Sequence, residues 1–300
     1  MTPDTAPDIT PDTTPDHSPE ATSAQNAGAA SAWDVAAADD VEAVRRQGKI
    51  RISEIFGPTV QGEGALLGMP TVFVRTGGCD FRCSWCDTLY AVDPTFRADW
   101  LPMDATAILD RVKQLSNNQP ILITLSGGNP AIQPLAPLIQ LGQQQGFTFA
   151  IETQGSIARK WFATLDHLTL SPKPPSSGTV FNANDLAACI AAARSPAATG
   201  TTPPFASSGP AITLKFPVAD EDDLAFADQV RQLHRDIPCY LQPVNATPAA
   251  PHPDGANGVD IEALTEKYRW LVDQVSQKGW FDVRVVPQWH VHVWGNLRGV

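Results

Sequence analysis

The sequence contains no apolar run that approaches the roughly 20 residues a membrane-spanning helix needs. Its N-terminus also lacks the basic and apolar regions of a signal peptide. Basic residues are outnumbered, with 21 Lys and Arg against 32 Asp and Glu, which gives a net charge of −11. This charge argues against a nucleic-acid-binding surface and against direct contact with anionic membranes. We therefore expect a cytoplasmic protein with reduced thiols and with neither nucleic acid nor membrane among its partners.

Cysteine is also scarce, and three of the five cysteines, Cys79, Cys83 and Cys86, form one C-x3-C-x2-C pattern. Three thiolates on one loop can hold three irons of a 4Fe-4S cluster and leave the fourth iron open to a small molecule. A structural zinc site usually needs four protein ligands, and cysteines this crowded are poor disulfide partners for one another. The pattern therefore favours the cluster over both alternatives. Cys189 and Cys239 stand apart in apolar surroundings, which is typical of buried core cysteines.

The first 48 residues repeat Thr-Pro-Asp with variation and then turn to Ala, Ser and Asn. Such a segment buries too little apolar surface to offset its ordering entropy, so we predict a disordered low-complexity tail over 1–48. A short helix over 35–47 is compatible with this tail. The folded part is predicted to span 49–300, with loop insertions near 195–210 and 246–258 where Pro, Ala, Gly and polar residues gather.

Strand and helix patterns alternate about six times through the folded part. The expected strands cover 50–56, 71–75, 121–125, 147–152, 167–170, 212–216, 239–241 and 283–286, and the expected helices 104–115, 135–145, 184–194, 221–234 and 261–277. This alternation predicts an α/β fold with a mostly parallel sheet and right-handed crossovers. Polar motifs follow the strands, and the carboxyl ends of parallel strands carry active sites. Their convergence predicts an enzyme.

An open iron suits S-adenosylmethionine (SAM), which chelates through its amino and carboxylate groups. Gly127 and Gly128, at the end of a predicted strand, would let the backbone approach the methionine part closely. Ser171 and Lys173 would hold the ribose or the carboxylate. Arg75 ends an apolar strand directly before the cysteine loop, where a guanidinium would bind a carboxylate in a bidentate manner. The pattern alone leaves this role of Arg75 and a surface ion pair equally open.

These motifs resemble the radical SAM superfamily and, within it, the 7-carboxy-7-deazaguanine synthase family. The matching stretches are Glu54-Ile55-Phe56, Gln61-Gly62-Glu63-Gly64, Phe73-Val74-Arg75, Cys86-Asp87-Thr88, Ser126-Gly127-Gly128-Asn129-Pro130, Glu152-Thr153-Gln154-Gly155, Ser171-Pro172-Lys173, Gln242-Pro243 and Pro287-Gln288-Trp289-His290. Gln-Gly-Glu-Gly before the cluster loop and Cys-Asp-Thr at its end are the most diagnostic. The resemblance implies a partial (β/α)6-type radical SAM barrel.

By this resemblance, the expected activity is that of a carbon–nitrogen lyase in queuosine and deazapurine biosynthesis. The enzyme would convert 6-carboxy-5,6,7,8-tetrahydropterin to 7-carboxy-7-deazaguanine with loss of ammonia. The implied cofactors are a 4Fe-4S cluster, SAM and Mg2+. The implied partners are the small-molecule pterin, an electron donor such as flavodoxin or ferredoxin, and a second copy of the chain in a homodimer.

The resemblance also assigns individual residues. Thr88 is the expected magnesium ligand. SAM contacts are expected from Trp85, Asp87, Gly127, Gly128, Asn129, Glu152, Ser171, Pro172, Lys173 and Gln242. Substrate contacts are expected from Val60, Gln61, Gly62, Glu63, Arg75, Ser126 and His290. His292 is expected on a strand face. Asn129 stands where many radical SAM proteins have Glu, and Val300 is given no role.

Two other functions share part of the pattern. A radical SAM activating enzyme, which acts on a protein partner, would need the cluster loop but neither the Gln-Gly-Glu-Gly turn nor a carboxylate-binding Arg75. A non-catalytic iron–sulfur electron-transfer module would not need sugar and amino-acid contacts at several strand ends.

Overall fold

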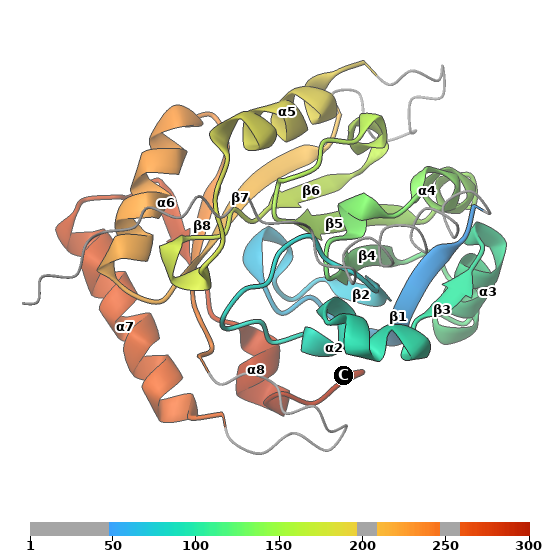
Figure 1. Cartoon of the computed structure of the whole chain (residues 1–300), viewed down its shortest axis with the longest axis horizontal. Coiled ribbons are helices and arrows are strands. Elements are labelled where there is room, and N and C mark those ends of the chain that lie inside the picture. Colours follow the sequence, from blue (N-terminus) through green and yellow to red (C-terminus); the bar gives the residue numbers. More distant parts are fainter. Residues whose placement is uncertain (1–47, 197–208, 247–258) are drawn as a thin grey trace, which may run out of the picture.

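The structure is a computed structural model that describes residues 48–196, 209–246 and 259–300 (Figure 1). Apart from Gly48, the predicted tail over 1–48 and the helix over 35–47 lie outside the described residues. The two predicted loop insertions also lie outside them, apart from the ends of each insertion.

The described residues form one nine-stranded sheet in the order β3-β1-β2-β4-β5-β6-β7-β8-β9. The strands are β1 Ile50–Val60, β2 Pro70–Thr76, β3 Leu101–Met103, β4 Leu122–Gly127, β5 Thr148–Thr153, β6 His167–Leu170, β7 Ala211–Val218, β8 Cys239–Pro243 and β9 Val283–Val285. From β2 through β4 to β9 every neighbouring pair is parallel. The predicted mostly parallel sheet is therefore confirmed.

Strand β1 differs from its neighbours because it pairs antiparallel with both β2 and β3. Only residues 61–69 connect β1 to β2, which is too short for the helical crossover that parallel strands need. The chain therefore turns back directly after β1, and the end of β1 lies beside the start of β2, where Val60 pairs with Pro70. The sequence pattern predicted a strand over 50–56 but not its antiparallel direction, and it did not predict the short edge strand β3.

Five helices surround the curved sheet, as Figure 1 shows. They are α3 Ala105–Leu115, α4 Ala136–Gln143, α5 Ala183–Arg194, α6 Glu221–Leu233 and α7 Ile261–Gln277, each within a few residues of its predicted range. Two short helices, α2 Leu89–Val92 and α8 Trp289–Trp294, were not predicted. Among the described residues, no helix is both long enough and apolar enough to cross a bilayer.

The core lies between the outer face of the sheet and the five helices, and strand β7 shows how its two faces divide. Leu214, Phe216 and Val218 are fully buried and belong to the apolar core together with residues of α6. Alternate residues of a strand point to opposite faces, so Lys215 faces the inside of the curved sheet. The inner face therefore carries polar groups that the helices do not cover.

Candidate active site

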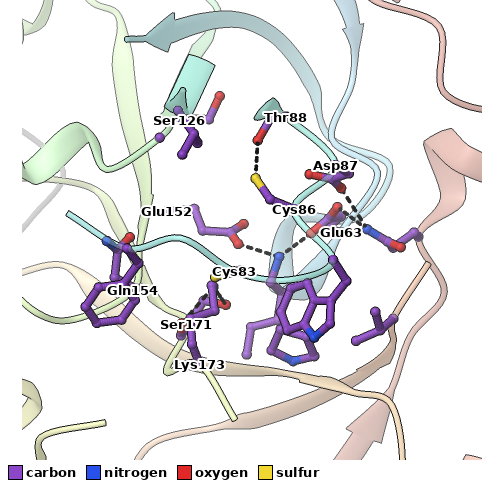
Figure 2. Close-up of a pocket in the computed structure, with 18 of the residues that line it drawn as sticks. Glu63, Cys83, Cys86, Asp87, Thr88, Ser126, Glu152, Gln154, Ser171 and Lys173 are labelled. Atoms are coloured by element: carbon purple, nitrogen blue, oxygen red, sulfur yellow. Dashed lines mark hydrogen bonds and ion pairs between the residues drawn. The ribbon is translucent and has the colours of Figure 1, made fainter. Parts of the chain in front are cut away.

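A cavity with about 1090 Å³ of empty space, including its open mouth, lies on the inner side of the sheet (Figure 2). It is lined by the cysteine loop between β2 and α2, by the ends of several parallel strands, and by the start of α8. The predicted site residues that line it are Glu63, Arg75, Cys79, Cys83, Trp85, Cys86, Asp87, Thr88, Ser126, Gly127, Gly128, Glu152, Ser171, Lys173, Gln242 and His290. Val60, Gln61, Gly62, Asn129 and Pro172 are not among its lining residues.

The cysteine loop, residues 77–88, is tied down on two sides. On one side, the backbone N–H of Gly78 donates to Ala91 O over 2.7 Å, and the backbone N–H of Asn129 donates to Gly78 O over 2.8 Å. On the other side, Trp85 Nε1 donates to Ser176 Oγ over 2.9 Å, on the connection between β6 and α5. These bonds hold the loop beside the cavity, and its three cysteines line one wall of that cavity.

The three loop cysteines are free thiols and half-buried, and they suit a multi-iron cluster better than a single ion. Two ligands of one zinc ion lie at most about 4.6 Å apart, twice the zinc–sulfur distance. In the described part of the chain, Glu63, Asp87 and His290 offer three metal-ligating atoms within 4.8 Å of one another. The three cysteine sulfurs do not form such a group, so they lie too far apart to share one ion as they stand. The thiols would have to move together to share a single ion, whereas a four-iron cluster offers each of them its own iron.

Burial raises the pKa of all three thiols, that of Cys79 to about 11. Two donors partly oppose this effect at Cys79, because the Phe81 amide and Gln154 Nε2 point at its sulfur from 3.4 and 3.5 Å. The thiols are therefore protonated at neutral pH in the absence of metal. Cluster binding must release these protons, which makes assembly favoured at higher pH.

Lys215 of β7 bridges two carboxylates, those of Glu63 and Glu152, both of which Figure 2 labels. Its ammonium group contacts Glu63, from the connection between β1 and β2, and lies 2.5 Å from Glu152 Oε1 of β5. Burial alone would lower the pKa of Lys215, but the two carboxylates raise it above its ordinary value. Burial also raises the pKa of Glu63, but the charges of Lys215 and His290 outweigh this effect and hold it well below its usual range.

Glu63 reaches this position by an unexpected route. The Gln61–Gly64 turn was expected at the carboxyl end of a parallel strand, but β1 is antiparallel and ends at the opposite edge. The turn enters the inside of the sheet from that edge, where Leu66 packs against Leu122 and Ala150. Gly62 packs so closely against α8 that a Cβ there would lie 2.6 Å from His290 Nδ1. The turn therefore brings Glu63 into the floor of the cavity and packs Gly62 against His290.

Arg75 lies between the cavity and the half-buried carboxylate of Glu54. Its Nε donates to Glu54 Oε1 over 2.7 Å, and the Tyr90 hydroxyl donates to the same oxygen over 3.0 Å. Burial lowers the pKa of Arg75, but Tyr90, Glu54 and Asp87 together raise it above its ordinary value, so the guanidinium stays charged. Among the described residues, no hydrogen bond uses its Nη atoms, and the side chain lines the cavity. The structure thus combines the two roles that the sequence left open for Arg75.

Two buried polar atoms in the cavity wall have no hydrogen-bond partner among the described residues, namely Ser126 Oγ and Gln242 Oε1. Ser126 is the penultimate residue of β4, and Gln242 is that of β8. Buried polar groups in folded proteins are nearly always paired, and an orphan in a cavity points to a missing ligand or water. Both atoms belong to residues that the sequence singled out for ligand contacts.

The remaining predicted residues divide into cavity and scaffold positions. Lys173 Nζ donates to Ser171 Oγ over 2.9 Å beside the cysteine loop. A Cβ on Gly128 would lie 2.2 Å from Gly78 O, so this glycine allows the strand end to pack on the cysteine loop. Asn129 is fully buried behind this contact and does not line the cavity, and its side chain bonds to Asp80 and Thr153. Its contact with SAM stays a prediction.

Comparison with characterised proteins identifies the family. The 7-carboxy-7-deazaguanine synthase of Bacillus subtilis is 38% identical over 257 residues, which cover 84% of this chain and 98% of that protein. The synthase of Bacillus cereus is 36% identical over 258 residues, covering 84% and 99%. The chain belongs to the 7-carboxy-7-deazaguanine synthase family. A scan against protein-family models gave no match.

Among solved structures, QueE from Escherichia coli matches with a TM-score of 0.58 at 20% identity, covering 84% of this chain and 99% of that one. This match supports the fold. Together, the comparisons confirm the predicted 7-carboxy-7-deazaguanine synthase family, the α/β fold and the assignment as a radical SAM enzyme of queuosine biosynthesis. Membership in this radical SAM family implies a 4Fe-4S cluster and SAM as cofactors.

Several residues that line or support the synthase cavity were missed from the sequence. Lys215 was the most detectable, because a lysine inside the apolar run Ile212–Phe216 must face a polar interior. Gln288 also lines the cavity, with its Nε2 3.2 Å from Glu63 Oε1. The expectation for His292 was wrong, because it lies on helix α8, where its ring is 6.1 Å from that of Trp289.

Proposed function

We propose that this chain converts 6-carboxy-5,6,7,8-tetrahydropterin to 7-carboxy-7-deazaguanine with loss of ammonia. The name of its relatives supports the product, 7-carboxy-7-deazaguanine. The proposal is supported by one arrangement: three free thiols line the same cavity as two buried polar atoms without a partner among the described residues, Ser126 Oγ and Gln242 Oε1. The charged side chains of Glu63 and Lys215 line it too. A simple electron-transfer module would need none of these additional groups. When bound, a 4Fe-4S cluster with SAM supplies a one-electron cleavage that yields a hydrogen-abstracting radical.

Cys79, Cys83 and Cys86 would hold the cluster, and the residues beside them would bind SAM. Ser171 and Lys173 present a hydroxyl and an ammonium group next to the loop, which suit the ribose and the carboxylate of SAM. Gly127, Gly128, Glu152 and Gln242 contribute the facing wall, and Trp85 and Asp87 complete the contacts from the loop itself. Burial in this cavity would shield a radical from water, because the loop closes one side of the sheet.

The pterin would lie on the floor. The Nη donors of Arg75 make no hydrogen bond within the described part of the chain and lie beside the cavity, and a guanidinium of fixed charge suits a carboxylate. Glu63 is ionised at neutral pH, so it can accept hydrogen bonds from the N–H groups of a pterin edge. Ser126 Oγ would gain the partner that it lacks within the protein. His290 stands above Glu63, with its Nδ1 3.7 Å from Glu63 Oε1, and can contact the same ligand.

Magnesium would bind where the cysteine loop ends. Thr88 offers a hydroxyl oxygen and Asp87 a neighbouring carboxylate, both of which line the cavity. Mg2+ prefers oxygen ligands and often shares them with a substrate carboxylate.

An electron donor such as flavodoxin or ferredoxin and a homodimeric assembly remain predictions from the resemblance.

The deciding experiment is an anaerobic assay of reconstituted protein with SAM, a reductant, Mg2+ and 6-carboxytetrahydropterin. We expect 7-carboxy-7-deazaguanine, identified by mass, and neither bound cluster nor product with Cys83→Ala. A radical SAM activating enzyme would cleave SAM without forming the deazaguanine, and an electron-transfer module would not cleave it. Cleavage of SAM without product would refute the proposed function.

A further inference from the structure

We propose that Asp80, Asn129, Gln154 and Ser156 form a positioning network that fixes an N–H donor on the sulfur of Cys79. The network would thereby raise the reduction potential of the cluster bound there. The inference rests on the proposed function only in that the three cysteines hold a cluster.

The centre of this network is the carboxylate of Asp80, the residue that follows the first cysteine of the loop. Its Oδ1 accepts from Gln154 Nε2 over 2.6 Å and from Asn129 Nδ2 over 2.8 Å. Its Oδ2 accepts from Ser156 Oγ over 2.6 Å. Three bonds from three side chains hold this one carboxylate, although Asp80 itself is exposed.

Gln154 links the carboxylate to the cluster ligand. Its Nε2 carries two hydrogens, and two acceptors are in reach, Asp80 Oδ1 and, at 3.5 Å, Cys79 Sγ. The residue is only 6% exposed, so water competes little for either bond. The bond to Asp80 fixes the orientation of the amide and thereby directs its other hydrogen to the sulfur.

Asn129 completes the network because it makes both kinds of hydrogen bond. Its Oδ1 accepts from Thr153 Oγ1 over 2.7 Å and from the Ala131 amide over 3.1 Å, while its Nδ2 donates to Asp80 and Ser156. A glutamate here would present a second carboxylate to Asp80 and no donor. The asparagine is therefore matched to the aspartate in the cysteine loop.

A hydrogen bond to a cluster sulfur stabilises the reduced form more than the oxidised form, because reduction adds negative charge. Removing the donor should therefore make the cluster harder to reduce. Burial strengthens this effect, because the local dielectric is low and the amide has no alternative orientation.

The test replaces the donor by a near-isosteric side chain without an N–H group, Gln154→Met. The midpoint potential of the reconstituted holoenzyme would be measured without SAM by potentiometric titration followed by electron paramagnetic resonance. Iron and sulfide content would be matched to the parent protein. We expect a lower midpoint potential in Gln154→Met. The control is Gln143→Met, because Gln143 also has a part-buried amide bond, to Thr164 O, but lies on α4 and contacts no cysteine.

An unchanged midpoint in Gln154→Met, or an equal shift in Gln143→Met, would overturn the proposal. If Gln154→Met does not fold, Ser156→Ala replaces it, since it removes one anchor of Asp80 at a half-buried position. A smaller shift in the same direction is then expected, and an unchanged midpoint overturns the proposal. A lowered potential in a protein that forms no deazaguanine would refute the proposed function and leave the network intact.

Discussion

Replacing Lys215 by methionine would leave two carboxylates facing each other across the floor of the cavity. Lys215 is 4% exposed, Glu63 is 15% exposed and Glu152 is 27% exposed at their side chains. Removing one partner of a buried ion pair costs about 3–5 kcal/mol, because the remaining charge is left buried and uncompensated. Glu152 keeps some solvent, so we expect a loss near the lower end, about 3 kcal/mol in the free energy of unfolding at neutral pH.

The loss should depend on pH in a defined direction. In the parent protein, the pKa of Glu63 is depressed, so its contribution to stability is present above its ordinary pKa of 4.5 and is lost as pH falls below it. The pKa of Lys215 is raised, so its contribution is present below its ordinary pKa of 10.5 and is lost only as pH rises further. Between these values the pair is fully formed. Without Lys215, the burial that raises the pKa of Glu63 is opposed less, and the carboxyl can take up a proton in mildly acidic solution.

The assay is urea unfolding of parent and variant under anaerobic conditions, followed by tryptophan fluorescence, at about pH 8 and about pH 5. We expect the variant's deficit to be larger at the higher pH. The double variant Lys215→Met/Glu63→Gln should recover part of the loss, because it removes one of the two uncompensated charges. Equal deficits at both pH values, or no recovery in the double variant, would refute the argument that Lys215 acts by neutralising buried carboxylates.

Three further substitutions test other contacts. Glu54→Gln removes the charge that orients Arg75, and a charged hydrogen bond contributes about 1.5–3 kcal/mol. The KM for the pterin should therefore rise at least tenfold, with kcat less affected. An unchanged KM would contradict this role. Ser126→Ala should keep or slightly raise the melting temperature, because an orphan hydroxyl is removed, while ligand affinity measured by calorimetry falls; a clear loss of stability would mean that the hydroxyl is paired in the protein. Trp85→Phe removes the bond to Ser176 and should cost about 1 kcal/mol in urea unfolding, and no loss would show that the cysteine loop is held by its other contacts.

Much of the fold followed from local patterns. The helices over 105–115 and 261–277 have clear apolar periodicity and an aspartate N-cap, so their predicted bounds lie within a residue of the observed ones. The direction of β1 depended on the length of its connection to β2. The alternation of strands and helices predicted a mostly parallel sheet but did not address this short connection, residues 61–69.

The site was predictable where chemistry and spacing coincide within a few residues, as in the cysteine loop. It was less predictable where a contact joins distant segments. Lys215 lies 152 residues from Glu63 in the sequence, and only the packed sheet brings the two together. Asn129 illustrates the same limit, because its Nδ2 donates to Asp80, which lies 49 residues earlier, and the sequence did not predict this bond.

The two ends of the cavity carry different chemistry, and the antiparallel strand explains why. The parallel strands β4, β5 and β6 lead their carboxyl ends towards the cysteine loop, which gathers hydroxyl, amide and ammonium groups around the thiols. A sheet of this kind would leave its inner face open from the other edge. Because β1 runs in the reverse direction, its turn fills that edge with Glu63 and supports His290. The reversed strand therefore gives the cavity a built floor, which is where the proposed pterin substrate would lie.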